Sequence, residues 1–534
     1  MTVRERLVSK AAEMAKVSVR GGFHLFWGLA VSTVISAVGL IVFARVLGPA
    51  GYGLYTIALI APSLIATFRD WGITSAMIKY TAQYNAENKP ANIRNILVAG
   101  LVFETSLGLA LSVLSFSLSG FLATTVFHRP SITLLIQVAS FTILTGALMT
   151  AAQAAFIGME KMVPNSITIV CQSIIKTVLV PVLVILGFGA YGAVVGTTVA
   201  TLIAGLIGVL LMWTIYRNLP KPNNGEYKLR LAENVKSMFK YGLPLSISSI
   251  LNGFLVQFYT FLMVIYASDL LIGNYSVANN FAVLITFFAS PIATMLFPAF
   301  SKLDAQKEKE TLQNVFQYSV KYAALLVVPT ATAMIVLAQP AVFTLFGDKY
   351  TASPLFLALL AFGSLYVAFG YLSFGNLING QGETGLYLKL TLINVATGFA
   401  LSLILIPPFG ILGLIATTLI DGIPGLIIGL LWIRGHYTVT VDWASSAKIL
   451  LSSAIAAGAT YAILSQLNLS SWINLIIGLA AFLLVFLLSI VLTRAVNQSD
   501  INNLREMTRE LRPLQTPINL ILNIIEKLMT AFHQ

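Results

Sequence analysis

Charged side chains are scarce in this sequence of 534 residues. Only 10% of the residues are Asp, Glu, Lys or Arg, whereas 57% are hydrophobic. A soluble domain carries about 25% charged residues, so this composition excludes a string of soluble domains and predicts a surface that faces lipid. The net charge of +12 does not indicate nucleic acid, because basic cytoplasmic loops of a membrane protein give the same sign.

Cysteine, histidine and the common catalytic motifs are also missing or rare. The chain has one cysteine, Cys171, and four scattered histidines. An intrachain disulfide is therefore excluded, and no zinc-ligand spacing occurs. The sequence contains neither a phosphate-binding G-x-x-x-x-G-K-[ST] loop nor a G-x-S-x-G nucleophile motif. We therefore expect no enzyme, no metal site and no cofactor.

Long apolar runs are what the sequence does contain. A helix needs about 20 apolar residues to cross a bilayer. Fourteen runs of roughly this length occur, at 23–44, 53–77, 96–119, 132–157, 166–187, 192–215, 243–266, 272–298, 322–345, 353–378, 387–408, 411–433, 446–465 and 472–493. The predicted fold class is an all-α polytopic membrane protein with fourteen transmembrane helices.

The distribution of lysine and arginine predicts the orientation of these helices. With the N-terminus in the cytoplasm, the cytoplasmic segments carry 27 of the 32 basic residues and the external loops only three. Basic residues concentrate in cytoplasmic loops. We therefore expect a multi-pass protein of the cytoplasmic membrane with both termini inside.

Two short motifs recur at a nearly constant offset. Residues 53–55 (Gly-Leu-Tyr) match 273–275 (Gly-Asn-Tyr), 220 positions later, and 188–192 (FGAYG) match 409–413 (FGILG), 221 positions later. A constant offset at distant points indicates duplication. Six spans in each half predict parallel repeats related by an axis along the membrane normal.

The repeats give five predicted segments. They are a first lobe at 1–217, a cytoplasmic inter-lobe loop at 218–242, a second lobe at 243–434, a terminal helix pair at 435–494, and a cytoplasmic amphipathic tail at 495–534. The tail alternates Asn, Glu and Lys with Ile and Leu at helical spacing, which predicts either a helix lying on the membrane surface or one packed on the protein's own loops.

Four local stretches resemble one transporter family. They are FARVLGPAGYGLY at 43–55, DWGITSA at 70–76, FGDKY at 346–350 and NGQG at 379–382. Together with two six-helix lobes and a terminal pair, they resemble the polysaccharide flippases of the multidrug/oligosaccharidyl-lipid/polysaccharide (MOP) exporter superfamily. The resemblance implies a V-shaped transporter whose central cavity is lined by spans 1, 2, 7 and 8.

The resemblance also implies the cargo, which is a polyprenyl-(pyro)phosphate-linked oligosaccharide moved to the outer leaflet by alternating access. Membrane lipids, and a glycan polymerase or glycosyltransferases, are the expected partners of a monomer that binds no nucleic acid. A proton or sodium ion is the candidate coupling ion, and the sequence favours neither.

Three alternatives stay open. A lipid II-type flippase also has fourteen spans, but this chain lacks the denser arginine cluster of that group in its first two spans. A MATE-like drug or cation antiporter usually ends at twelve spans. A membrane glycosyltransferase or ligase would carry larger and more charged outer loops than these, whose only charged residues are Arg45, Arg129, Asp269, Asp348 and Lys349.

Ionisable residues inside membrane spans are costly, so each is a candidate for function. The anionic linkage of the cargo needs a cation, and the candidates on spans 1, 2 and 5 are Arg20, His24, Arg69 and Lys176. The candidates for coupling are the acidic residues Asp70, Glu104 and Asp421. The alternative is structural, with Arg69 paired to Asp70 and Lys176 paired to Glu104.

Amides and hydroxyls in the second lobe suit a neutral glycan. Span 7 places Ser248, Asn252 and Tyr259 along one polar stripe, and span 8 adds Asn279 and Asn280. Such side chains also hold membrane helices together, so helix packing is the competing interpretation.

Overall fold

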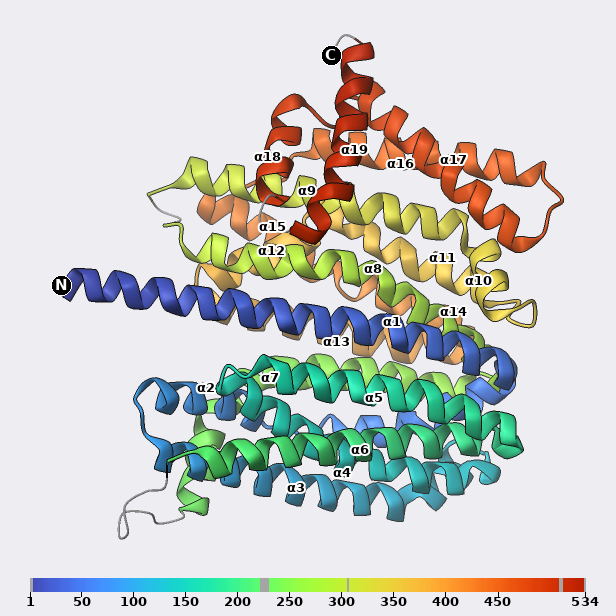
Figure 1. Ribbon diagram of the computed structural model, residues 1–534. Coiled ribbons are helices and arrows are strands. Elements are labelled where there is room, and N and C mark those ends of the chain that lie inside the picture. Colours follow the sequence, from blue (N-terminus) through green and yellow to red (C-terminus); the bar gives the residue numbers. More distant parts are fainter. Residues whose placement is uncertain (1–2, 221–229, 305–306, 509–511, 533–534) are drawn as a thin grey trace. The chain divides into compact units, whose positions relative to one another are not determined.

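The computed structural model describes residues 3–220, 230–304, 307–508 and 512–532. Side chains are described in these ranges apart from 3–27, 244–245, 248, 286–299, 507–508, 512–514 and 517. All regular structure in the described ranges is helical (Figure 1). The predicted all-α class is therefore confirmed.

The chain divides by its contacts into two compact units. The first comprises Met1–Gly273 with Ile406–Leu414, and the second comprises Asn274–Leu405 with Ile415–Gln534. This division falls within the first turns of α8 (Asp269–Ser301). The predicted lobes rest on the sequence repeat instead, and they stay a prediction.

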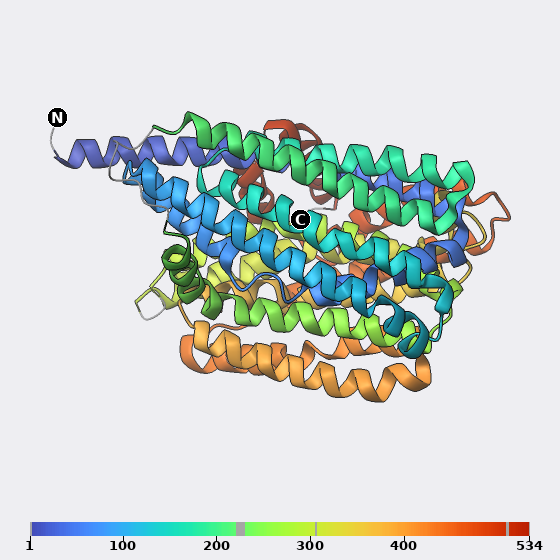
Figure 2. The same cartoon turned by 90° about the horizontal axis from the view of Figure 1, so that it is seen from below.

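The helices of the first unit run lengthwise beside one another in both views (Figures 1 and 2). They are α1 (Val3–Ala66), α2 (Ile73–Ala86), α3 (Pro90–Phe121), α4 (Thr133–Gly158), α5 (Met162–Leu183), α6 (Gly189–Asn218) and α7 (Leu231–Tyr266). α1 contains the first predicted span, 23–44, and the first part of the second, 53–77, separated by a kink at Gly48, whose φ of +68° is accessible to glycine. The second predicted span is wrong beyond Ala66, because α1 ends there and a turn leads to α2 at Ile73.

Residues singled out by the repeat lie at close helix contacts in the first unit. A Cβ at Gly53 would stand 1.8 Å from the carbonyl oxygen of Asp269, and a Cβ at Gly273 would stand 1.8 Å from that of Pro49. The hydroxyl of Tyr55 lies 3.1 Å from that of Thr197. Small residues let membrane helices approach this closely, which gives the recurring glycines a structural reason.

The second unit contains the remainder of α8 and eleven further α-helices among its described residues. They are α9 (Lys309–Val336), α10 (Ala338–Phe346), α11 (Ser353–Gly363), α12 (Tyr371–Gly380), α13 (Thr384–Phe409), α14 (Ile411–Ile420), α15 (Ile423–Tyr437), α16 (Trp443–Ser465), α17 (Ser471–Leu492), α18 (Gln498–Thr508) and α19 (Arg512–Ala531). The last residues of α13 and the first residues of α14, within Ile406–Leu414, belong to the first unit. A buried apolar cluster joins α9, α16, α17 and α19.

The described part of the chain has ten segments long and apolar enough to cross a membrane, or eleven if a pair bent by 51° at Gly370 is one span. Two of these segments, Gly28–Ala66 and Met162–Asn218, have 39 and 57 residues. The shorter segment has a positive φ at Gly48, and the longer segment has positive φ at Gly187 and Gly189. The longer segment far exceeds the length of one membrane span. The protein is polytopic, and the count of fourteen stays a prediction.

Candidate functional site

A buried ion pair in the first unit starts from the turn that ends α1. After Ala66 the backbone bonds tighten, with Phe68 N–H donating to Ile65 O and Arg69 N–H to Ala66 O. Such 3₁₀-type bonds, from an N–H to the carbonyl three residues earlier, are typical of a helix end. The chain thereby leaves the helix at Arg69, and its long side chain reaches α3 and α4.

Arg69 pairs with Glu104 of α3. The Nε atom lies 3.3 Å from Glu104 Oε2, and the Arg69 side chain is 15% exposed whereas the Glu104 side chain is wholly buried. On α4, Nη2 donates to Thr150 Oγ1 at 2.8 Å and Nη1 to Ile143 O at 3.3 Å. A buried carboxylate is costly unless it is paired, so the Arg69 guanidinium stabilises the charge of Glu104.

A glycine on α4 makes room for this guanidinium. A Cβ at Gly146 would stand 3.1 Å from Arg69 Nη1. One turn later, the Thr150 hydroxyl donates to Gly146 O at 2.9 Å while it accepts from Arg69. Gly146 and Thr150 therefore shape the site, although the sequence analysis did not single them out. The sequence signal for these two residues is a glycine followed four positions later by a hydroxyl residue.

Asp70 has a different role from its neighbour. Its Oδ1 accepts the backbone N–H of Gly72 at 2.8 Å and that of Thr74 at 3.4 Å. These bonds satisfy donors at the start of α2 that lack a helical partner. The structural alternative of an Arg69–Asp70 pair is therefore wrong, since Arg69 turns to Glu104 and Asp70 turns to the backbone.

Lys176 does not join this cluster. It lies half-buried on α5, and no ion pair or hydrogen bond of Lys176 is found among the described residues. The alternative pairing of Lys176 with Glu104 is also wrong, because the Glu104 partner is Arg69. Arginine presents a planar fork with several donors, which suits contacts to both α3 and α4.

The remaining cationic candidates lie outside the described side chains. Arg20 and His24 belong to the first part of α1, where only the backbone is described, and their roles stay predictions.

The coupling candidate Asp421 lies between α14 and α15, and its backbone N–H donates to Thr417 O at 2.9 Å. The predicted span 411–433 nevertheless lies within one apolar segment, Ile411–Tyr437, that is long enough to cross a membrane.

The predicted glycan residues differ in exposure. Tyr259 is buried and Asn252 is exposed on α7, while the Ser248 side chain lies outside the described residues. On α8, Asn279 and Asn280 are exposed, and the Asn280 amide donates to Ser276 O at 2.8 Å. The backbone bond of Asn280 fits the helix-packing interpretation, whereas the exposure of Asn279 leaves its amide accessible.

Two further polar clusters were not predicted. In the first unit, Arg129 binds Asp269 with Nε and Oδ1 2.7 Å apart, and it donates to Val264 O at 2.6 Å and Ala267 O at 2.7 Å. In the second unit, Lys321 Nζ lies 2.6 Å from Asp500 Oδ2, with both side chains largely buried. These partners are far apart in the sequence, so no local pattern pointed to them.

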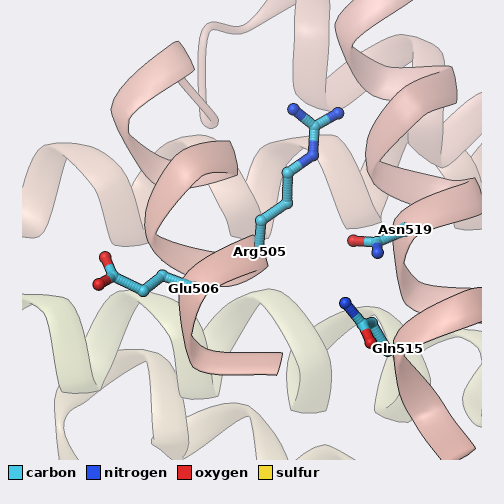
Figure 3. Close-up of a pocket in the computed structure, with 4 residues that line it drawn as sticks. All are labelled: Arg505, Glu506, Gln515 and Asn519. Atoms are coloured by element: carbon cyan, nitrogen blue, oxygen red, sulfur yellow. The ribbon is translucent and has the colours of Figure 1, made fainter. Parts of the chain in front are cut away.

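A cavity of about 410 Å³ lies between α18 and α19 in the second unit (Figure 3). Its lining residues are Arg505, Glu506, Gln515 and Asn519. Arg505 also donates to Glu526 and to Asn523 Oδ1. This polar cavity belongs to the tail and is separate from the ion pair on α3 and α4.

These features define a polytopic α-helical membrane protein with a charged pair buried among its spans. Comparison with known families narrows the class, because the family model described as polysaccharide biosynthesis protein matches residues 18–304. That match covers more than half of the chain, so the chain belongs to this family. The predicted resemblance is confirmed.

Curated relatives are similar at low identity. The probable low-salt glycan biosynthesis flippase Agl15 of Haloferax volcanii is 23% identical over 307 residues, which cover 57% of this chain and 63% of the relative. The chain thus matches less than two thirds of that relative's length. The lipopolysaccharide biosynthesis protein WzxC of Escherichia coli is 23% identical over 502 residues, which cover 92% of this chain and 89% of the relative.

Solved structures share the fold. A lipid II flippase MurJ in an inward closed conformation matches with a TM-score of 0.68 and 16% identity, covering 89% of this chain and 99% of that one. An inward-facing multidrug resistance MATE family transporter of the MOP superfamily matches with a TM-score of 0.60 and 18% identity. The match covers 77% of this chain and 97% of that one. The MOP-type fold expected from the sequence is therefore confirmed.

Proposed function

We propose that this protein is a flippase that moves a polyprenyl-(pyro)phosphate-linked oligosaccharide across the cytoplasmic membrane by alternating access. The single observation that carries the proposal is membership of the polysaccharide biosynthesis family. The flippase names of several relatives support it. The Arg69 site adds the chemistry, since an anionic cargo that crosses a membrane needs a cation there.

Arg69 is the proposed ligand of the phosphate. A guanidinium binds phosphate oxygens through paired hydrogen bonds, whereas an ammonium acts as a point charge. Charge attraction at 4 Å rises from about 1 kcal/mol in water to about 4 kcal/mol near a protein surface, so a partly buried arginine binds an anion well. Arg20 and His24 assist where the cargo enters, and Lys176 offers a second cation on α5.

Glu104 is the proposed coupling group. Its carboxylate and the cargo phosphate compete for the same guanidinium, because Arg69 is the cation found beside Glu104. When phosphate takes Arg69, Glu104 would be a buried unpaired charge, which is strongly unfavourable. Uptake of a proton removes that charge, so a proton enters as the phosphate binds. Asp70 and Asp421 are secondary candidates for coupling.

The glycan and the membrane arrangement complete the proposal. The exposed Asn252 and Asn279, with Ser248, supply amide and hydroxyl groups to a neutral sugar, whereas the buried Tyr259 and the backbone-bonded Asn280 hold the helices that carry them. The protein has fourteen spans in two parallel repeats and a terminal pair, and both termini are cytoplasmic. It acts in the plasma membrane as a monomer that receives its cargo from glycosyltransferases and passes it to a polymerase.

Complementation separates this function from the alternatives. Expression in cells that lack an oligosaccharide flippase of matching substrate should restore their surface glycan, and it should not raise resistance to cationic drugs. Rescue of cells lacking a lipid II flippase, without glycan rescue, would instead favour lipid II as the cargo. Drug resistance without either rescue would identify a MATE-like antiporter.

A further inference from the structure

The tail helix α19 has three distinct faces. Its first face packs on the protein, because Leu522, Ile525 and Met529 are buried in the same apolar cluster as residues of α16 and α17. These positions follow helical spacing. The tail sequence fits a helix that packs on the protein as well as one that lies on the membrane, and this face shows that α19 packs on the second unit.

The second face is polar and is occupied by α18. Arg505 donates to Glu526, and Gln498 Nε2 donates to Glu526 Oε1 at 2.8 Å. The hydrogen bond from Arg505, followed by that from Gln498, lowers the pKa of the Glu526 carboxyl. α18 is itself attached to α9 through the buried Lys321–Asp500 pair. This face of α19 is therefore fixed by polar contacts.

The third face is apolar and exposed. Leu520 is 63%, Ile521 48% and Ile524 40% exposed. At 100° per residue, Ile521 borders the packed face, Leu520 lies opposite Met529, and all three side chains point away from Glu526. Three large aliphatic side chains on one exposed face are unfavourable in water, at about 25 cal/mol for each Å² of apolar surface.

We propose that this exposed face of α19, formed by Leu520, Ile521 and Ile524, lies in the acyl chains of a membrane leaflet. Two observations identify lipid as the occupant. α19 runs steeply across the direction of α16 and α17 (Figure 1), as a helix in the membrane plane does. The packed face also adjoins α17, a membrane-spanning segment.

α17 itself exposes apolar side chains on the face opposite its buried residues. Leu484, Leu488 and Leu492 of that span are exposed, and in a membrane-spanning helix such side chains face lipid. α17 ends at Leu492, and α19 packs on it. An apolar helix face with a polar opposite face is typical of a helix lying in the interface. α19 thus packs on a span whose opposite face is exposed and apolar.

Spin labels on the full-length protein test this proposal. Cys171 is replaced by Ser, single cysteines replace Ile521, Ile524 or Thr530, and each labelled protein is reconstituted in nanodiscs of phosphatidylethanolamine and phosphatidylglycerol. Thr530 is the matched control, because it is exposed on the polar side of α19. Labels at 521 and 524 should collide often with oxygen and rarely with a water-soluble nickel chelate, and the label at 530 should show the reverse.

Two results would overturn the proposal. Nickel collisions at 521 and 524 equal to those at 530 would place the face in water. Low collision rates with both reagents would mean that protein covers it, either a second copy of this chain or another partner. Neither result affects the proposed flippase activity, which the complementation experiment measures independently.

Discussion

At the scale of single residues, the Arg69–Glu104 pair shows how far sequence reasoning reaches. Hydropathy identified both residues as charges inside spans, because ionisable groups are rare there. It could not identify their partners, since the rotation of each helix and the exit of the chain at Arg69 depend on tertiary contacts. The structural alternative paired the sequence neighbours Arg69 and Asp70, but Asp70 accepts the backbone N–H groups of Gly72 and Thr74 instead.

Gly146 gives a prediction at this scale. Val at position 146 would place atoms against Arg69 Nη1 and displace the guanidinium from Thr150, since a Cβ there already stands 3.1 Å away. We expect G146V to lower transport of the lipid-linked glycan at least tenfold in reconstituted vesicles. Transport falls because the displaced Arg69 guanidinium no longer lies where it is proposed to bind the phosphate.

The control for this change is Gly120→Val on α3. A Cβ at Gly120 would have no atom of the described residues within 4 Å, so the same substitution meets no neighbour there. We expect G120V to transport at the wild-type rate. Equal loss in both variants would mean that the effect comes from the helices and not from the Arg69 site.

At the scale of helices, the sequence predicted which segments are apolar but not where they break. The predicted span 353–378 is interrupted by a 3₁₀ segment, Ser364–Phe369, and by Gly370 with φ of +87°. Within the predicted span 411–433, α14 ends at Ile420 and α15 begins at Ile423, although the whole segment Ile411–Tyr437 can still cross a membrane. A hydropathy average does not detect such breaks, because the residues on both sides are equally apolar.

The attachment of α18 gives the prediction at this scale. Asp500→Asn leaves the Lys321 ammonium largely buried and without its carboxylate, and removing one partner of a buried pair costs about 3–5 kcal/mol. We expect D500N to lower the thermal unfolding temperature in detergent. The Lys321→Met/Asp500→Asn double variant should recover most of that loss.

Glu506→Gln is the matched control for the attachment of α18. Glu506 lies on the same helix but is exposed, so removal of its charge should leave the unfolding temperature unchanged. An unfolding temperature of D500N equal to that of E506Q would show that the Lys321–Asp500 pair contributes nothing to stability.

At the scale of the whole molecule, the all-α membrane class and the family could be predicted from the sequence. Composition and apolar runs were sufficient for the class, and four short motifs were sufficient for the family. The boundary of the compact units at Gly273 and Asn274 was not predicted, because it depends on contacts between helices that are distant in the sequence. A repeat in sequence does not determine which helices pack together.

Membrane topology gives the prediction at this scale. In a variant without Cys171, single cysteines in 465–471 should react with an impermeant thiol reagent on intact cells. Cysteines in 217–240 should react only after the membrane is opened, because that basic segment is expected in the cytoplasm. Equal labelling of both segments on intact cells would contradict the topology.

The central claim is that the Arg69 charge binds the cargo and does more than neutralise Glu104. The decisive measurement compares flipping of a lipid-linked oligosaccharide in vesicles by Arg69→Gln and by Arg69→Gln/Glu104→Gln. The single variant should lose stability, since Glu104 is left buried and unpaired at a cost of about 3–5 kcal/mol. The double variant should unfold near the wild-type temperature but still fail to flip its cargo. It should also fail to bind the cargo, whereas Glu104→Gln alone, which removes the coupling group but keeps the Arg69 charge, should still bind it. Wild-type flipping by the double variant would contradict the account, because the pair would then be structural only.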